Sequence, residues 1–188
     1  MRGLVLITAM ACLGAGCAHD PMMTTIGWRT PYRLQPVPRS LFAGKTSYTH
    51  EVTLERNDKE ISFVGQAQWR EGTLTLAGLA PFGRLFMIEF DDNLNAELSE
   101  ALPAVLKAGH LLGDFELIFW PAESLVRGGL DLEEGPGQRV VSRKGKAIAT
   151  ISYDAQTGEG LARAATLINH SRHYSVHVVP MASAPGDE

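Results

Sequence analysis

Hydrophobic and polar residues alternate with a period of two along most of the chain beyond residue 47. In the segment 47–56, every second residue from Tyr48 to Leu54 falls on one face of an extended strand, while threonine and glutamate residues occupy the other. The alternation recurs in further segments, which are 61–70, 73–79, 84–91, 94–98, 138–143, 146–153, 161–168 and 172–179. Because loops of two to four residues join antiparallel neighbours, most of this pattern predicts an antiparallel meander.

A helical pattern interrupts the strands in the middle of the chain. Apolar residues recur at i, i+3 and i+4 over 102–106, and at i, i+4 and i+7 over 111–118. These spacings predict two short helices with a broad apolar stripe. Trp120 and Pro121 end the second helix, since a residue before proline disfavours the α conformation. One short strand is expected between the turns at 127–129 and 134–137.

These elements predict a mainly β fold with a helical insertion. A sheet of about nine or ten strands curls, and its concave face must be covered. The sequence offers only the helices as cover, so we expect a curved antiparallel sheet under short lid helices. Large apolar residues on both can enclose a cavity, and the candidate lining residues are Phe63, Trp69, Leu74, Leu76, Phe86, Ile88, Phe90, Phe115, Ile118 and Trp120. The alternative is a core that such side chains fill completely.

The N-terminus has the pattern of an export signal that leads into a cysteine. Arg2 precedes an apolar run over 4–13 that is too short to span a bilayer. The segment 13–17 resembles the bacterial lipobox, although Leu13 lies one position further from Cys17 than the usual aliphatic residue does. We therefore predict a signal peptide over 1–16 and lipidation of Cys17. The alternative is an ordinary secretory signal with an incidental cysteine.

The residues around Cys17 also predict where the chain is anchored. Cys12 would leave with the signal peptide, so Cys17 would have no disulfide partner. A multiply acylated cysteine is sufficient for stable membrane anchoring. Ala18 follows Cys17, whereas an aspartate at that position retains lipoproteins at the inner membrane of typical Gram-negative bacteria. The expected location is the periplasmic face of the outer membrane.

Proline content and periodicity divide the rest of the chain. Residues 17–46 are rich in proline and lack a clean period, which predicts a tether and an irregular entry into the fold. Its larger apolar residues are expected to pack on the domain without forming an element of their own; they are Trp28, Tyr32, Leu34 and Leu41. The domain itself is expected over 47–180, with a flexible tail over 181–188.

Composition and charge narrow the classes of partner. The chain has 188 residues, is 45% hydrophobic and carries a net charge of −4, which suits one globular domain. No run of basic residues is present, so nucleic acid is not an expected partner. The same acidic balance argues against an electrostatic hold on an anionic membrane surface.

Motifs for catalysis or metal binding are weak. His173 and His177 share one face of an expected strand, but His170 lies off that row and no carboxylate is close in sequence. Neither a Gly-x-Ser-x-Gly elbow nor a phosphate-binding glycine loop occurs, and Glu89 is a lone carboxylate. We therefore expect no enzyme activity, metal or cofactor. A hydrolase centred on the histidines is the least favoured alternative.

A family resemblance adds to this interpretation. The tetrad over 80–83, the Trp120-Pro121 pair and the run over 140–153 with its final hairpin resemble LolB, the outer-membrane receptor of the lipoprotein localisation system. They resemble more closely a related proteobacterial lipoprotein family, whose members are often encoded beside fatty-acid-like and aryl polyene biosynthesis enzymes. The resemblance covers roughly 45–180 and implies a half-open β-barrel with an acyl-chain cavity. Phe82 occupies the position of a protruding leucine that LolB uses for membrane insertion; alternatively, it folds back into the core.

The expected function is the transfer of apolar cargo in the periplasm. An outer-membrane lipoprotein of this fold would bind lipoprotein acyl chains or a lipid-linked polyene and hand them on without chemistry. The expected partners are the acyl ligand, the outer membrane and a periplasmic carrier protein. The competing hypothesis is a tethered interaction module of an envelope assembly, with a packed core and no ligand.

Overall fold

One antiparallel sheet of ten strands forms most of the protein. The computed structural model describes residues 22–26, 30–42, 44–91, 93–102 and 106–182. The first half of the sheet consists of β3 (Ser47–Arg56), β4 (Lys59–Arg70), β5 (Thr73–Ala80), β6 (Gly83–Phe90) and β7 (Leu94–Leu98). The second half consists of β8 (Asp131–Gly135), β9 (Gln138–Arg143), β10 (Lys146–Tyr153), β11 (Ala165–Asn169) and β12 (Tyr174–Pro180).

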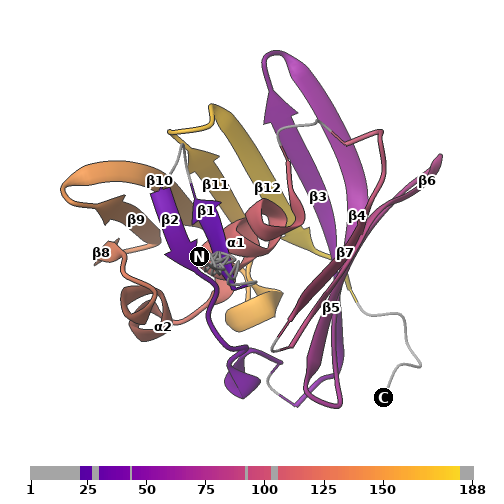
Figure 1. Ribbon diagram of the computed structural model, residues 1–188, viewed down its shortest axis with the longest axis horizontal. Helices are drawn as coiled ribbons and strands as arrows, with labels where there is room; N and C mark the ends of the chain where they lie inside the picture. The colour runs from indigo at the N-terminus through magenta and orange to yellow at the C-terminus, as the bar shows by residue number, and fades with distance from the viewer. Residues whose placement is uncertain (1–21, 27–29, 43, 92, 103–105, 183–188) are drawn as a thin grey trace, which may run out of the picture.

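The sheet curves into an open trough (Figure 1). Its strand order is β7-β6-β5-β4-β3-β12-β11-β10-β9-β8, so two meanders meet where β3 pairs with β12. In the described part of the chain, β7 and β8 lie at opposite ends of this order and do not pair with each other. The prediction of a curved, half-open antiparallel sheet covered by helices is confirmed.

Two-residue turns set the register of the hairpins. Arg56 pairs with Lys59, so Asn57 and Asp58 alone connect β3 to β4. Both have positive φ, of 50° and 59°, as a type I′ turn requires. The resulting register places His50 and Leu54 on the buried face of β3, as the alternation predicts. The strand predicted over 161–168 begins later, at β11, because its first residues form a short 3-10 helix, η2 (Gly160–Ala162).

Helix α1 (Ala108–Phe119) lies inside the trough. It ends before Trp120 and Pro121, as predicted. A second helix, α2 (Ala122–Arg127), begins directly after Pro121, a residue whose fixed φ suits a helix start. The helix predicted over 102–106 is wrong at its described ends, because neither Leu102 nor Leu106 is helical. Both are nevertheless buried, so burial accounts for their apolar character.

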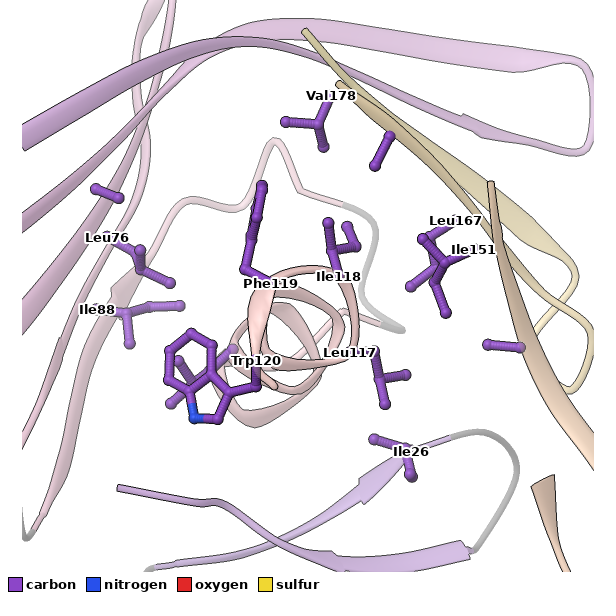
Figure 2. Close-up of a cluster of buried hydrophobic side chains, with 14 of the residues drawn as sticks. Ile26, Leu76, Ile88, Leu117, Ile118, Phe119, Trp120, Ile151, Leu167 and Val178 are labelled. Carbon is purple, nitrogen blue, oxygen red and sulfur yellow. The ribbon is translucent and has the colours of Figure 1, made fainter. Parts of the chain in front are cut away.

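The N-terminal segment forms a hairpin that closes the open side of α1. Strands β1 (Met23–Ile26) and β2 (Thr30–Arg33) pair with each other, and η1 (Arg39–Phe42) is a 3-10 helix. The prediction that this segment forms no element is wrong, because contacts with α1 order two strands too short to be seen in the pattern. Tyr32, Leu34 and Leu41 are buried as expected, while Trp28 lies outside the described residues. Figure 2 shows α1 end on, with the sheet around it and Ile26 of the hairpin beneath it.

Polar contacts fix the C-terminal end of α1. Arg139 of β9 is buried and donates to the carbonyl oxygens of Leu117 and Trp120 at 3.0 and 2.9 Å. It also pairs with Glu134 at 2.8 Å. The Tyr153 hydroxyl donates to the Ile118 carbonyl at 2.9 Å. Carbonyls that a helix leaves unpaired at its end are thus satisfied by side chains of the sheet.

Replacing Arg139 with methionine is expected to destabilise the protein by about 3 kcal/mol, since two buried carbonyls lose a charged donor. Urea denaturation measures the free energy of unfolding. The matched control is Lys146→Met on β10, where the lysine is exposed and the cost should stay within about 0.5 kcal/mol. Equal stability of the two variants would show that Arg139 does not hold α1.

Candidate functional site

An apolar cavity of about 90 Å³ lies between α1 and the inner face of the sheet. Neighbouring strands supply one wall, with Leu54 on β3, Phe63 and Ala67 on β4, Leu76 on β5 and Phe86 on β6. The helix supplies the other wall through Leu111, Asp114, Phe115, Ile118 and Phe119. In Figure 2, Ile118 and Phe119 point from α1 toward the sheet, and Leu76 points from the sheet toward α1.

Half of the predicted lining residues surround this cavity. These are Phe63, Leu76, Phe86, Phe115 and Ile118. The remaining five pack elsewhere in the core or at its edge; they are Trp69, Leu74, Ile88, Phe90 and Trp120. The Trp120 indole donates to the Pro36 carbonyl at 3.2 Å, on the side of α1 that faces the N-terminal segment.

Among the lining residues that the sequence analysis missed, two depend on the order of the strands. Val176 and Val178 of β12 line the cavity, and β12 lies beside β3. The alternation along 172–179 marks the two valines as inward-facing, but a meander alone places β12 far from β3. Only the pairing of the first and last strands brings them to the site.

Aromatic rings limit the size of the cavity. Phe63 and Phe86 meet edge to face with ring centroids 5.6 Å apart, and Phe115 and Phe119 lie 4.8 Å apart. Pockets that hold drug-sized ligands measure about 300–1,000 Å³, and a cavity of about 150 Å³ accepts benzene. The present space therefore accommodates only a short stretch of hydrocarbon. A longer chain requires these rings or α1 to move.

Two polar side chains reach the cavity wall. The His50 ring lies 2.7 Å from the Leu161 carbonyl through Nε2, and burial lowers the pKa of the imidazole, so the ring is neutral and donates. Asp114 accepts a hydrogen bond from the Tyr174 hydroxyl. Burial raises the pKa of Asp114 to about 6, against the opposing effects of Tyr174 and Arg172. The site thus offers hydrocarbon contact with little charge.

A second buried carboxyl on α1 faces away from the cavity. Glu116 is fully buried and accepts hydrogen bonds from the Tyr32 hydroxyl at 2.5 Å and the Gln35 amide at 3.0 Å. Burial raises the pKa of Glu116 to about 8, although both donors act in the opposite direction. Because Asp114 and Glu116 are two residues apart on a helix, their side chains lie on opposite sides. They do not form an acid–base pair, and Glu116 instead joins α1 to the segment after β2.

The histidines do not form the expected row. β12 begins at Tyr174, so His173 lies in the preceding turn with a φ of 56° and not on the strand with His177. His170 and His177 each lie 2.8 Å from a threonine hydroxyl, of Thr150 and Thr166. Within the described ranges, no three His, Cys, Asp or Glu side chains are grouped so that they could hold a metal ion.

The turn between β5 and β6 carries an exposed apolar patch. Phe82 at its tip is 71% exposed, which rules out the alternative of a core position. Leu79 and its cross-strand neighbour Val64 are also exposed. Cys17 lies outside the described residues. Of the helices in those residues, none has the length and apolar character needed to cross a membrane.

Comparison with known proteins gives a family for the domain. No curated protein matches the chain. A family model matches residues 47–182, from the start of β3 to just beyond β12. The match includes the sheet, both helices and every cavity residue, but not the β1–β2 hairpin. The chain belongs to the family described as protein of unknown function (DUF3261).

Proposed function

We propose that the protein is a lipid-anchored carrier, which binds an acyl chain between α1 and the sheet and hands it on without chemistry. The observation that carries this proposal is the apolar cavity beneath α1, whose walls come from large hydrocarbon side chains on two separate elements. A covering helix on a half-open sheet can move without breaking the ladder of the sheet. The resemblance to LolB, which implies an acyl-chain cavity, is part of the same proposal.

Hydrocarbon burial supplies the binding energy in this proposal. Each methylene that leaves water contributes about 0.8 kcal/mol, part of which offsets the movement of Phe115 and Phe119. Contacts of this kind discriminate poorly between chains, so the carrier would accept several acyl lengths. Lipoprotein acyl chains and a lipid-linked polyene are the cargo candidates, and a periplasmic carrier protein would deliver them.

The proposed anchor at Cys17 places the helical side of the fold near the membrane. Five residue steps lead from the cysteine to the first described residue, Met22. A chain of that length spans at most about 18 Å. An acylated Cys17 in the outer membrane would therefore keep the β1–β2 hairpin, and α1 beneath it, close to the periplasmic face.

Filling the cavity tests the proposal. Ala67 lies on the cavity wall and is almost completely buried, so Ala67→Leu adds three carbon atoms to a space of about 90 Å³. Uptake of a fluorescent fatty acid by a chain that starts at Ala18 is expected to fall at least about tenfold, the effect of a steric conflict of 1–3 kcal/mol. This chain retains all of the core, which begins at Ile26 in the described residues.

The matched control for this experiment is Ala96→Leu, the same change at an exposed position on β7. Its uptake should equal that of the unmodified chain. Normal uptake by the Ala67→Leu protein, with an unchanged melting temperature, would mean that the fatty acid binds elsewhere.

A tethered interaction module is the second candidate, and the small volume of the cavity favours it. Such a module would carry no lipid and would bind a protein through an exposed surface such as the patch around Phe82. Native mass spectrometry of the chain from Ala18 separates the two functions. Stoichiometric bound lipid supports the carrier, whereas a protein without lipid that also takes up no fatty acid supports the module.

A further inference from the structure

A second groove shares a lining residue with the apolar cavity. It measures about 580 Å³, and Leu54 lines both spaces. Besides Leu54, its apolar wall includes Ile61 and Leu102. Its polar wall includes Arg56, Asn57, Lys59 and Glu60. The two spaces therefore meet at one side chain and differ in polarity.

Along the β3–β4 hairpin, the inward-facing residues change from apolar to cationic. Alternate residues share a face, so the inner row of β3 runs from His50 through Val52 and Leu54 to Arg56. On β4, Ile61 pairs with Leu54 and Lys59 pairs with Arg56. A hydrocarbon-lined trough thus ends in two cations that lie directly opposite each other.

The length of this row suits an acyl chain. At about 3.3 Å per residue, the six steps from His50 to Arg56 span roughly 20 Å. The acyl chains of one bilayer leaflet span roughly 15 Å, half of the hydrocarbon thickness. A chain whose head group lies at Arg56 and Lys59 would therefore extend along most of the row toward His50.

Arg56 lacks a partner for part of its guanidinium group. Its Nε is shielded from solvent and has no hydrogen-bond acceptor among the described residues. The neighbouring Glu60 also lines the groove, but its carboxylate already accepts a hydrogen bond from the Ser62 hydroxyl, which in turn contacts Thr53. A shielded cationic donor without an acceptor is costly, and an anionic oxygen would satisfy it.

We propose that Arg56 and Lys59 bind the anionic head of the cargo, which makes the cargo an acyl amphiphile that ends in a carboxylate or a phosphate. This inference rests on the proposed carrier function and narrows it, because a neutral acyl chain would leave the two cations unused. The overall negative charge of the chain does not oppose this proposal, since the two cations lie opposite each other on neighbouring strands at the groove.

Paired ligands with the same chain test this head-group site. The chain from Ala18 is titrated with palmitate and with hexadecanol, and displacement of a neutral fluorescent probe gives each affinity. We expect palmitate to bind at least about tenfold more tightly than hexadecanol. In the double variant Arg56→Gln with Lys59→Gln, that preference should disappear while hexadecanol affinity stays the same.

Two controls show whether the effect belongs to this pair of cations. Arg70→Gln removes an exposed arginine from the other end of β4 and should leave the preference intact. Arg56→Lys keeps the positive charge and should retain most of the preference for palmitate. Palmitoyl lysophosphatidate serves as a third ligand to identify the head group. If it binds more tightly than palmitate, the site prefers a phosphate; if palmitate binds more tightly, the site prefers a carboxylate.

The possible failures are distinguishable. Equal affinity of the unmodified chain for palmitate and hexadecanol would overturn the head-group site and leave the carrier function standing. A preference that survives in the double variant would do the same. Binding of none of the three ligands would overturn the carrier function itself.

Discussion

Replacing Glu116 with glutamine is expected to remove the main fall in the free energy of unfolding between pH 6 and pH 8. Burial raises the pKa of Glu116 from 4.5 to about 8, so between these values the folded protein holds a proton that the unfolded chain releases. The contribution of Glu116 to the free energy of unfolding is therefore largest below pH 4.5 and is lost as the pH rises through 8. The slope is about 1.4 kcal/mol per pH unit, or roughly 5 kcal/mol in all.

Asp114 has the same sign of effect in a lower window. Burial raises its pKa from 3.8 to about 6, so its contribution is lost as the pH rises through 6, at the lower limit of the range in which Glu116 is tested. Between pH 6 and pH 8, Glu116 makes the largest contribution to the expected slope. His50, whose pKa burial lowers from 6.5, acts in the opposite direction near pH 6.5. Glutamine resembles the protonated carboxyl in shape and can still accept a hydrogen bond from the backbone amide of Gln35. The variant should therefore be at least as stable as the unmodified protein at pH 8.

Urea denaturation at pH 6, 7 and 8 measures this effect. Glu123→Gln is the matched control, since Glu123 is exposed on α2, and its stability should fall with pH as in the unmodified protein. Parallel curves for the unmodified protein and the Glu116→Gln variant would mean that Glu116 is ionised in the folded state throughout this range.

The hairpins of the sheet were predictable because each follows from local chemistry. Alternation sets which face of β3 and β4 is buried, and Asn57 and Asp58 tolerate the positive φ of a tight turn. Trp120 and Pro121 likewise end α1 by a local steric effect. These rules need only neighbouring residues, which the sequence contains.

The helical layer was less predictable because it depends on contacts between distant segments. Asp114 and Glu116 read as ordinary polar positions in sequence, yet Tyr174 and Tyr32, 60 and 84 residues away, make their burial possible. The β1–β2 hairpin exists because α1 presents glycines to it. A side-chain carbon at Gly109 would overlap Thr24. The local sequence pattern of these segments does not indicate such a contact.

Half of the predicted cavity residues were misplaced for a related reason. Leu74, Ile88 and Phe90 face inward as predicted, but the neighbouring core covers them completely. Periodicity identifies the inner face of a strand and does not tell which part of that face remains uncovered. The position of α1 along the trough decides this, and it follows from the Arg139 and Glu116 contacts at its C-terminal half.

Replacing Phe82 with glutamate is expected to slow transfer of bound fatty acid to membranes by roughly 30- to 150-fold, while uptake is unchanged. Phe82 is 71% exposed at the tip of the β5–β6 turn, with Leu79 and Val64 beside it. Insertion of its ring into a bilayer would contribute about 2–3 kcal/mol, and a carboxylate at the same position would oppose insertion. The cavity is unaffected, since Phe82 does not line it.

Transfer of a fluorescent fatty acid from the protein to phosphatidylcholine vesicles measures this step. Phe82→Leu should transfer nearly as fast as the unmodified protein, because leucine also inserts. Val126→Glu places the same charge at another exposed apolar position, on α2, and should have little effect. Vesicles without net charge exclude simple electrostatic repulsion as the cause. If the Phe82→Glu protein delivers its ligand at the normal rate, the turn takes no part in membrane contact, and the apolar patch becomes evidence for a protein partner instead.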